Sequence, residues 1–270
     1  FKNTGLETEF NATGLQNGFW FGGGKDVMIN EDGASFIASS LVNIFWFGTG
    51  QDMFRNDNAL FDTTGGGLTY FNFGDNQDQF FNSNGAAFFA GENTYFVFGD
   101  GKDTFTNDNA LFVTAGGSGP FPGVAFDFGK GADEFINQNG AAFFTNQDDG
   151  LLTLIDFGRG SDTFYNRTGA EFYTENFTVL DFGAGNNDQL INTSYIKVND
   201  SLRLYNLELF DNAGGMLDMV DGDTEDYVDQ FHGDFGGGGE LAIDAELTPG
   251  GSADQLYVGG DTVNGGTMVE

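Results

Sequence analysis

Seven copies of the dipeptide Phe-Gly follow one another at nearly constant spacing, and this repeat constrains the fold more than any other feature of the sequence. The intervals between successive copies are 26, 26, 25, 30, 29 and 25 residues. The copies begin at Phe21, Phe47, Phe73, Phe98, Phe128, Phe157 and Phe182. A period in this range indicates a repeat architecture, in which one small structural unit stacks on the next.

Each copy contains the elements of three short strands. The consensus opening is Phe-Gly-x-Gly-x-Asp-x-φ-x-Asn, where φ is apolar, although Asn76 replaces the second Gly of the third copy and the seventh copy has one extra residue before Asp188. In six copies a Gly-Ala-x-Phe or Ala-Leu-Phe phrase follows. A third apolar segment, such as TYFVF, precedes the next Phe-Gly. This unit is too short for a propeller blade of about 40 residues and shows no helical period. We therefore predict an all-β fold, a right-handed parallel β-helix (a solenoid) with a C-terminal cap region.

Side-chain alternation predicts which residues form the core. In Asp-x-φ-x-Asn, the Asp, φ and Asn side chains share one side of the strand. We expect the φ residues to point inward: Met28, Phe54, Phe80, Phe105, Phe135, Phe164 and Leu190. A second inward column is expected at Phe36, Phe61, Phe88, Phe112, Phe143 and Phe172, and a third at the Phe of each Phe-Gly. The final Asn residues predict an internal amide ladder: Asn30, Asn56, Asn82, Asn107, Asn137, Asn166 and Asn192.

The charge balance excludes several classes of partner. The 270 residues include 41 acidic and 9 basic side chains, a net charge of −32. Nucleic acid is not expected as a partner, because phosphate binding needs clustered Lys and Arg. We do not expect the chain to be embedded in a membrane, because no apolar run approaches the roughly 20 residues of a span. The absence of Cys suits a large repetitive core, and a chain that crosses membranes unfolded.

About the last 60 residues resemble the C-terminal end of pertactin-like autotransporter passengers (type V secretion). The resemblance is carried by a Gly-rich turn at 236–239, strand-like segments at 241–244 and 252–258, and a Gly-Thr close at 265–267. It implies an autochaperone-like cap, a translocating β-barrel elsewhere in a longer precursor, and a place on the outer surface of a Gram-negative bacterium. We expect Phe-rich repeats at 1–193, followed by C-terminal rungs and the cap at 194–270.

One acidic residue per repeat forms the strongest candidate site. If the rungs stack in register, these carboxylates form one column: Asp26, Asp52, Asp78, Asp103, Asp133, Asp162 and Asp188. Gly-x-Gly-x-Asp-x-φ-x resembles the calcium repeats of RTX proteins, which implies Ca²⁺ between stacked turns. Alternatively, each Asp accepts hydrogen bonds from amides of its own Gly turn, or faces solvent. We expect no other cofactor.

These features predict a non-enzymatic surface protein. We expect an exported autotransporter passenger that mediates adhesion or self-association, with a surface receptor or polysaccharide as its partner. One alternative is an RTX-like calcium-binding secreted or S-layer protein, and another is a β-helical enzyme that acts on polysaccharide. No catalytic residue is proposed, because the single histidine, His232, has no second His or Cys to support it and is expected in a solvated loop.

Overall fold

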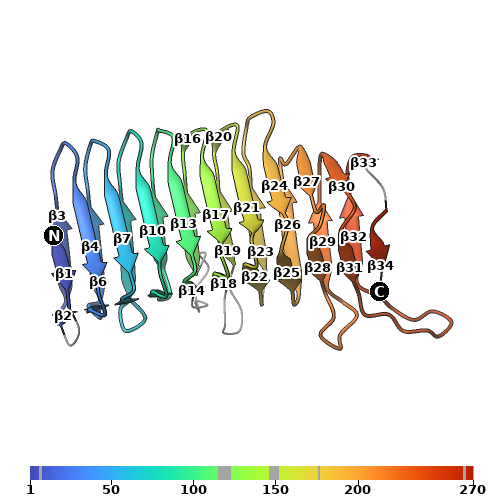
Figure 1. Cartoon of the computed structure of the whole chain (residues 1–270), viewed down its shortest axis with the longest axis horizontal. Coiled ribbons are helices and arrows are strands. Elements are labelled where there is room, and N and C mark those ends of the chain that lie inside the picture. The colour runs from blue at the N-terminus through green and yellow to red at the C-terminus, as the bar shows by residue number, and fades with distance from the viewer. Residues whose placement is uncertain (6–7, 115–122, 146–151, 176, 264–265, 270) are drawn as a thin grey trace.

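The protein coils through about ten turns of a parallel β-solenoid. The computed structural model describes residues 1–5, 8–114, 123–145, 152–175, 177–263 and 266–269. Rungs follow one another from the blue N-terminal end to the red C-terminal end in Figure 1. Strands account for 55% of the residues, and the described ranges contain no helix. The predicted all-β parallel solenoid is confirmed, whereas its right hand and a distinct cap remain predictions.

None of the described segments forms an apolar helix of the length that a bilayer crossing requires.

Sheet A holds the strand that follows each Phe-Gly turn. Its 11 strands pair in parallel, and each lies beside the strand of the next rung. They are β1 (Lys2–Thr4), β4 (Val27–Glu31), β7 (Met53–Asp57), β10 (Gln79–Ser83), β13 (Thr104–Asp108), β17 (Glu134–Gln138), β21 (Thr163–Arg167), β24 (Gln189–Asn192), β27 (Leu209–Asp211), β30 (Asp234–Gly236) and β33 (Thr262–Val263).

Sheet B follows after the turn that contains Gly or Asn. Residues with positive φ form this turn, such as Asn139 (57°) and Gly140 (76°), and Gly and Asn adopt this conformation most readily. Its 11 strands are β2 (Glu9–Ala12), β5 (Ser35–Ala38), β8 (Leu60–Asp62), β11 (Ala87–Ala90), β14 (Leu111–Thr114), β18 (Ala142–Thr145), β22 (Glu171–Thr174), β25 (Tyr195–Val198), β28 (Met216–Asp218), β31 (Glu240–Ala242) and β34 (Met268–Val269).

Sheet C carries the third strand of each rung and ends at the next Phe-Gly. Its 10 strands are β3 (Gln16–Trp20), β6 (Val42–Trp46), β9 (Leu68–Asn72), β12 (Thr94–Val97), β15 (Val124–Asp127), β19 (Thr153–Asp156), β23 (Thr178–Asp181), β26 (Ser201–Tyr205), β29 (Tyr227–Gln230) and β32 (Gln255–Val258). A small fourth sheet pairs β16 (Lys130–Gly131) with β20 (Arg159–Gly160) where the chain turns from sheet C into sheet A.

Equivalent residues lie over one another, so the core consists of stacked phenylalanines. Phe54, Phe80 and Phe105 are register partners on successive rungs, and all are fully buried. Within a column most rings stack, as in Phe61 and Phe88, whose centroids lie 5.0 Å apart, although Phe135 and Phe164 meet edge to face. Rings of different columns meet edge to face or at a tilt. Edge-to-face contact is a favourable geometry for aromatic pairs. The three predicted Phe columns are confirmed, and only Phe21, in the first Phe-Gly, is partly exposed.

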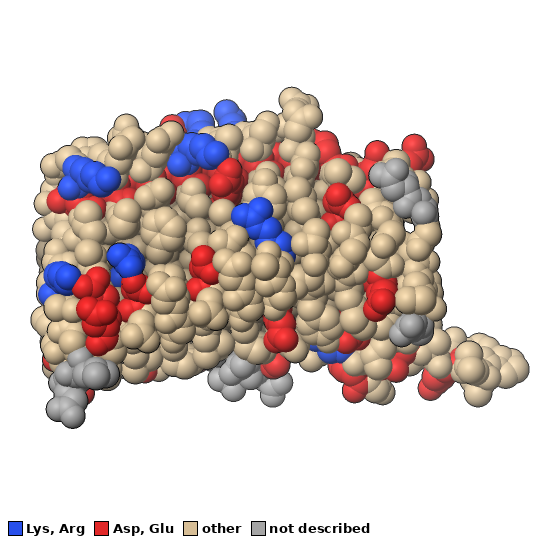
Figure 2. Space-filling view, viewed as in Figure 1, with Lys and Arg blue, Asp and Glu red and all other residues tan. Residues whose placement is uncertain are grey.

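The same three sheets continue beyond residue 193. Strand β27 pairs with β24, and β30 pairs with β27, so that Phe210 and Phe235 extend the φ column above Leu190. Residues 194–263 therefore include rungs of the same solenoid. Figure 2 shows the acidic side chains in red over the length of one face, with fewer basic side chains in blue.

Candidate functional site: a buried aspartate ladder

The seven repeat aspartates occupy one internal column at the start of the sheet A strands. Six of them are at most 1% exposed, and Asp26, nearest the N-terminus, is partly exposed. The Gly-x-Gly phrase makes room for this column. A Cβ atom on Gly158 would lie 1.9 Å from the Gly129 carbonyl oxygen, and one on Gly160 would lie 2.8 Å from Asp162 Oδ1. The second glycine of the phrase thus leaves the space that the carboxylate occupies.

Each carboxylate from Asp52 to Asp188 accepts a hydrogen bond from the rung before it rather than from its own turn. The Asp78 amide donates to Asp103 Oδ1 at 2.7 Å, and the Asp103 amide donates to Asp133 Oδ1 at 2.7 Å. The same bond links every neighbouring pair from Asp26 to Asp188, and Glu208 Oε2 accepts the last amide, from Asp188. We call this column the Asp ladder. The prediction that each Asp accepts hydrogen bonds from amides of its own Gly turn is wrong, because the donor lies in the preceding rung. The alternative that the carboxylates face solvent is also wrong, because they are buried.

In each carboxylate from Asp52 to Asp188, only one of the two oxygens accepts a hydrogen bond. The Oδ2 atoms of all seven aspartates are buried and accept no hydrogen bond from the protein. Burial, reinforced by the neighbouring carboxylates, raises the pKa of Asp103 from 3.8 to about 8 even though the Asp78 amide lowers it. The same causes raise the pKa of Asp133 to about 8 and that of Asp162 to about 7. A carboxyl group with a pKa of about 8 is mostly protonated at neutral pH, which lowers the repulsion between Asp103 and Asp133.

Calcium fits this arrangement poorly. Ca²⁺ is coordinated by about six to eight oxygen atoms, several of them from carboxylates. Each rung supplies one ladder carboxylate, and its Oδ1 already accepts an amide. Across the described ranges, no three His, Cys, Asp or Glu side chains are placed to hold a single metal ion. Calcium at the Asp ladder therefore stays a prediction from the sequence, and we derive no chemistry from it.

A second ladder lies at the other end of the sheet A strands. The Nδ2 group of Asn82 donates to Asn107 Oδ1 at 2.9 Å and to the Leu111 carbonyl at 2.8 Å. Equivalent side-chain bonds connect Asn3 through Asn192 and extend to Asn212. The predicted amide ladder is therefore confirmed, and it is longer than the repeat consensus indicated. We call this column the Asn ladder.

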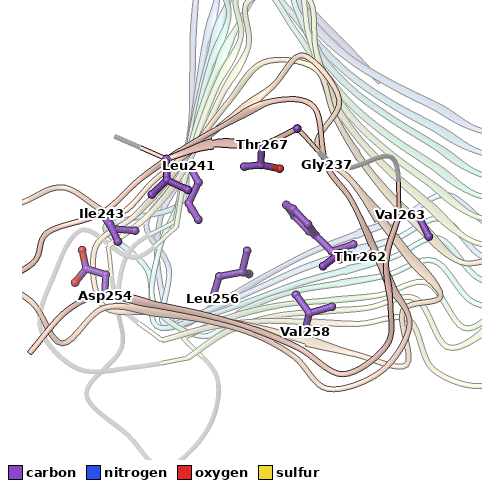
Figure 3. Close-up of a pocket in the computed structure, with 12 residues that line it drawn as sticks. Gly237, Leu241, Ile243, Asp254, Leu256, Val258, Thr262, Val263 and Thr267 are labelled. Atoms are coloured by element: carbon purple, nitrogen blue, oxygen red, sulfur yellow. The ribbon is translucent and has the colours of Figure 1, made fainter.

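The C-terminal end of the solenoid contains an apolar hollow. It has a volume of about 580 Å³ and is lined by Leu241, Ile243, Leu256 and Val258 among others. Figure 3 shows these side chains pointing into the interior of the last rungs. They pack against the buried core, so the hollow is the end of the core. His232 is exposed, as expected for a loop histidine.

Sequence reasoning missed a line of hollows along the corner that carries the Phe-Gly turns. One hollow of about 650 Å³ is lined by Trp46, Asn72, Val97 and corner glycines. The next, of about 510 Å³, is lined by Asp127, Asp156 and Asp181 among others. These aspartates are register partners in sheet C. The signal was present in the sequence, because an Asp precedes Phe-Gly in three consecutive copies.

Comparison with known proteins identifies no family for this chain. No family model matches the sequence, no curated protein matches it significantly, and no solved structure does so either.

Proposed function

We propose that the chain is the exported, non-enzymatic passenger of an autotransporter, which mediates adhesion or self-association on the surface of a Gram-negative bacterium. The observation that carries this proposal is the stack of about ten turns with a continuous Phe core. Such a stack holds an elongated surface rigid without disulfides. The C-terminal resemblance to pertactin-like passengers supplies the secretion route, and the net charge of −32 supports solubility outside the cell.

A display experiment tests the proposal. The chain is fused to a translocating β-barrel in a laboratory Gram-negative strain, and surface attachment and cell clumping are measured. We expect either readout to increase several-fold over cells that display the barrel alone. A fusion that is displayed in equal amount without a change in attachment or clumping would contradict the adhesive role. Sequencing the gene beyond Glu270 tests the secretion route, because an autotransporter requires a barrel in the same reading frame.

An RTX-like calcium-binding protein is the second candidate, favoured by the unpartnered Oδ2 atoms of the Asp ladder. A bound ion would stabilise the folded state by mass action. Thermal unfolding with EDTA and with added Ca²⁺ separates the two candidates. The passenger proposal predicts the same midpoint in both conditions, whereas a midpoint that falls in EDTA and recovers with Ca²⁺ favours the calcium-binding protein.

A further inference from the structure

Aromatic side chains are concentrated on the outer face of sheet C. Both tryptophans of the chain lie there, on the first two strands, with Trp20 65% exposed and Trp46 43% exposed. None of the first four strands, β3, β6, β9 and β12, contains an acidic or basic residue. We call the outward residues of these strands the aromatic face: Trp20, Ile44, Trp46, Tyr70, Tyr95 and Val97.

The stacked rungs order this face. Trp20 is the register partner of Trp46, and Tyr70 is the register partner of Tyr95. The Trp20 ring lies over Gly18, where an added Cβ would be 1.8 Å from its Cη2 atom. The glycine thus lets the indole rest against the sheet while most of its surface remains open to solvent. The result is a broad apolar platform on a rigid scaffold.

Polar groups border the platform. The hollow of about 650 Å³ joins Trp46 and Val97 to Asn72, Asp75 and the backbone of the corner glycines. Farther along the same corner, the second hollow presents Asp127, Asp156 and Asp181. Amide and carboxylate groups provide hydrogen-bond donors and acceptors beside the aromatic rings. We call these two hollows, together with the aromatic face beside the first of them, the trough.

We propose that this trough binds a linear, uncharged polysaccharide. The faces of sugar rings carry C–H groups that pack on aromatic rings, and hydroxyl groups at their rims hydrogen-bond to amides and carboxylates. A linear polymer can follow successive rungs. This inference deepens the proposed adhesive function, on which it rests, by naming the ligand class.

The charge of the protein favours an uncharged polymer over a second copy of the chain, an anionic polymer or lipid surface, and a basic peptide. A second copy would bring another net charge of −32, and long-range repulsion opposes its approach. Anionic polysaccharides and anionic lipid surfaces are disfavoured for the same reason. A basic peptide would find carboxylates at Asp75 and in the second hollow, but none on the first four strands, where the aromatic rings lie. An uncharged polymer avoids both the repulsion and the need for a countercharge.

Tryptophan fluorescence is a reporter of this face, because the chain has no tryptophan elsewhere. The folded chain is tested for retention on cellulose, chitin, mannan and β-1,3-glucan, with alginate as the anionic control. We expect retention on at least one neutral polymer, and a saturable fluorescence change with its soluble hexasaccharide. The double variant Trp20→Ala/Trp46→Ala should weaken retention at least about tenfold, because both stacking rings are removed.

Tyr257→Ala is the matched control, since Tyr257 is an exposed aromatic residue, 51% accessible, on β32 at the far end of the same sheet. It should leave retention unchanged. Circular dichroism and the unfolding midpoint establish that each variant is folded. The inference is overturned if no neutral polymer retains the protein, or if the double variant binds as well as the parent chain. It is also overturned if the tryptophans instead mediate concentration-dependent dimerisation without polymer binding.

The display experiment distinguishes this inference from the broader function. Adhesion without polymer retention would contradict the polysaccharide site and leave the adhesive role intact. Polymer retention by the purified chain, without adhesion or clumping of displaying cells, would contradict the adhesive role and leave the site intact.

Discussion

The two corners that flank sheet A differ in how closely the backbones of successive rungs approach each other. At the Gly corner, which leads from each Phe-Gly to the ladder Asp, backbone packs on backbone, and Gly158 leaves no room for a Cβ. At the Asn corner, which follows each ladder Asn, Gly140 also has positive φ, but an added Cβ would meet nothing within 4 Å. Each corner carries one buried polar side chain per rung.

The difference between the two ladders follows from the chemistry of the groups. An amide has both a donor and an acceptor, so stacked Asn side chains can hydrogen-bond to one another. An ionised carboxylate only accepts, so the Asp ladder uses one oxygen on a backbone amide and leaves the other without a partner. Repetition thus stabilises the Asn ladder directly, whereas the Asp ladder depends on protonation.

The largest expected effect comes from replacing a glycine of the Gly corner with alanine, and a glycine of the Asn corner provides the matched comparison. Gly158→Ala should lower the free energy of unfolding by about 4 kcal/mol, through overpacking against the Gly129 carbonyl and strain at φ +80°. Gly140→Ala should cost about 1 to 2 kcal/mol, through backbone strain alone. Urea unfolding of the two variants measures the difference. Equal losses would show that the close backbone approach at the Gly corner has no special role.

A smaller loss is expected when a carboxylate enters the Asn ladder. In Asn107→Asp, the groups that accepted from Asn107 Nδ2, including Asn137 Oδ1 and the Ala142 carbonyl, lose their donor. The expected cost at pH 7 is about 3 kcal/mol, since a buried unsatisfied group costs about 1 to 3 kcal/mol. Acid should recover part of this loss by protonating the new carboxyl. The exposed outer-face change Glu9→Gln serves as the control, and a loss no larger than its own would contradict the ladder's role.

The most specific effect, which depends on pH, is expected from the reverse exchange, Asp103→Asn. The pKa of Asp103 is raised to about 8 by burial, so the native state binds its proton more tightly than the unfolded state does. Its contribution to stability is fully present below about pH 4 and is lost as the pH rises toward 8. Asn cannot ionise, so the variant should gain little over the parent at pH 4 and more than about 1 kcal/mol, the value of a single pKa unit, at pH 9.

Urea unfolding across this pH range measures the effect, with the exposed Asp32→Asn as the control. A gain of the same size at both pH values would contradict the raised pKa.

Much of the fold was predictable because like residues occupy like positions. The alternation of side chains along a strand was enough to predict the inward column that contains Met28, Phe54 and Phe80. The same alternation, with the recurrence of Asn30 and Asn56, predicted the amide ladder. The partner of each Asp was not predictable, because the sequence does not show how far one turn is offset from the next. The structure places the Asp103 carboxylate beside the amide of Asp78 in the preceding rung, and not within its own turn.

The repeat also continues where its consensus fails. Asn212 joins the Asn ladder only 20 residues after Asn192, and Glu208 takes the acceptor position of an Asp. The rung is shorter and Phe-Gly is absent, so spacing alone did not reveal it. The aromatic face was missed for a different reason, because outward positions tolerate many residues and Trp20 and Trp46 recur only twice.

The most direct test of the ladder comparison is a ¹³C NMR titration of the aspartate side-chain carboxyl groups. We predict a group of resonances with midpoints between about pH 6 and 8 for the buried ladder, from Asp188 at about 6 to Asp133 at about 8. One of these resonances should be absent from the Asp103→Asn variant. Midpoints near pH 4 for every aspartate would contradict the account, because the buried carboxylates would then be ionised at neutral pH.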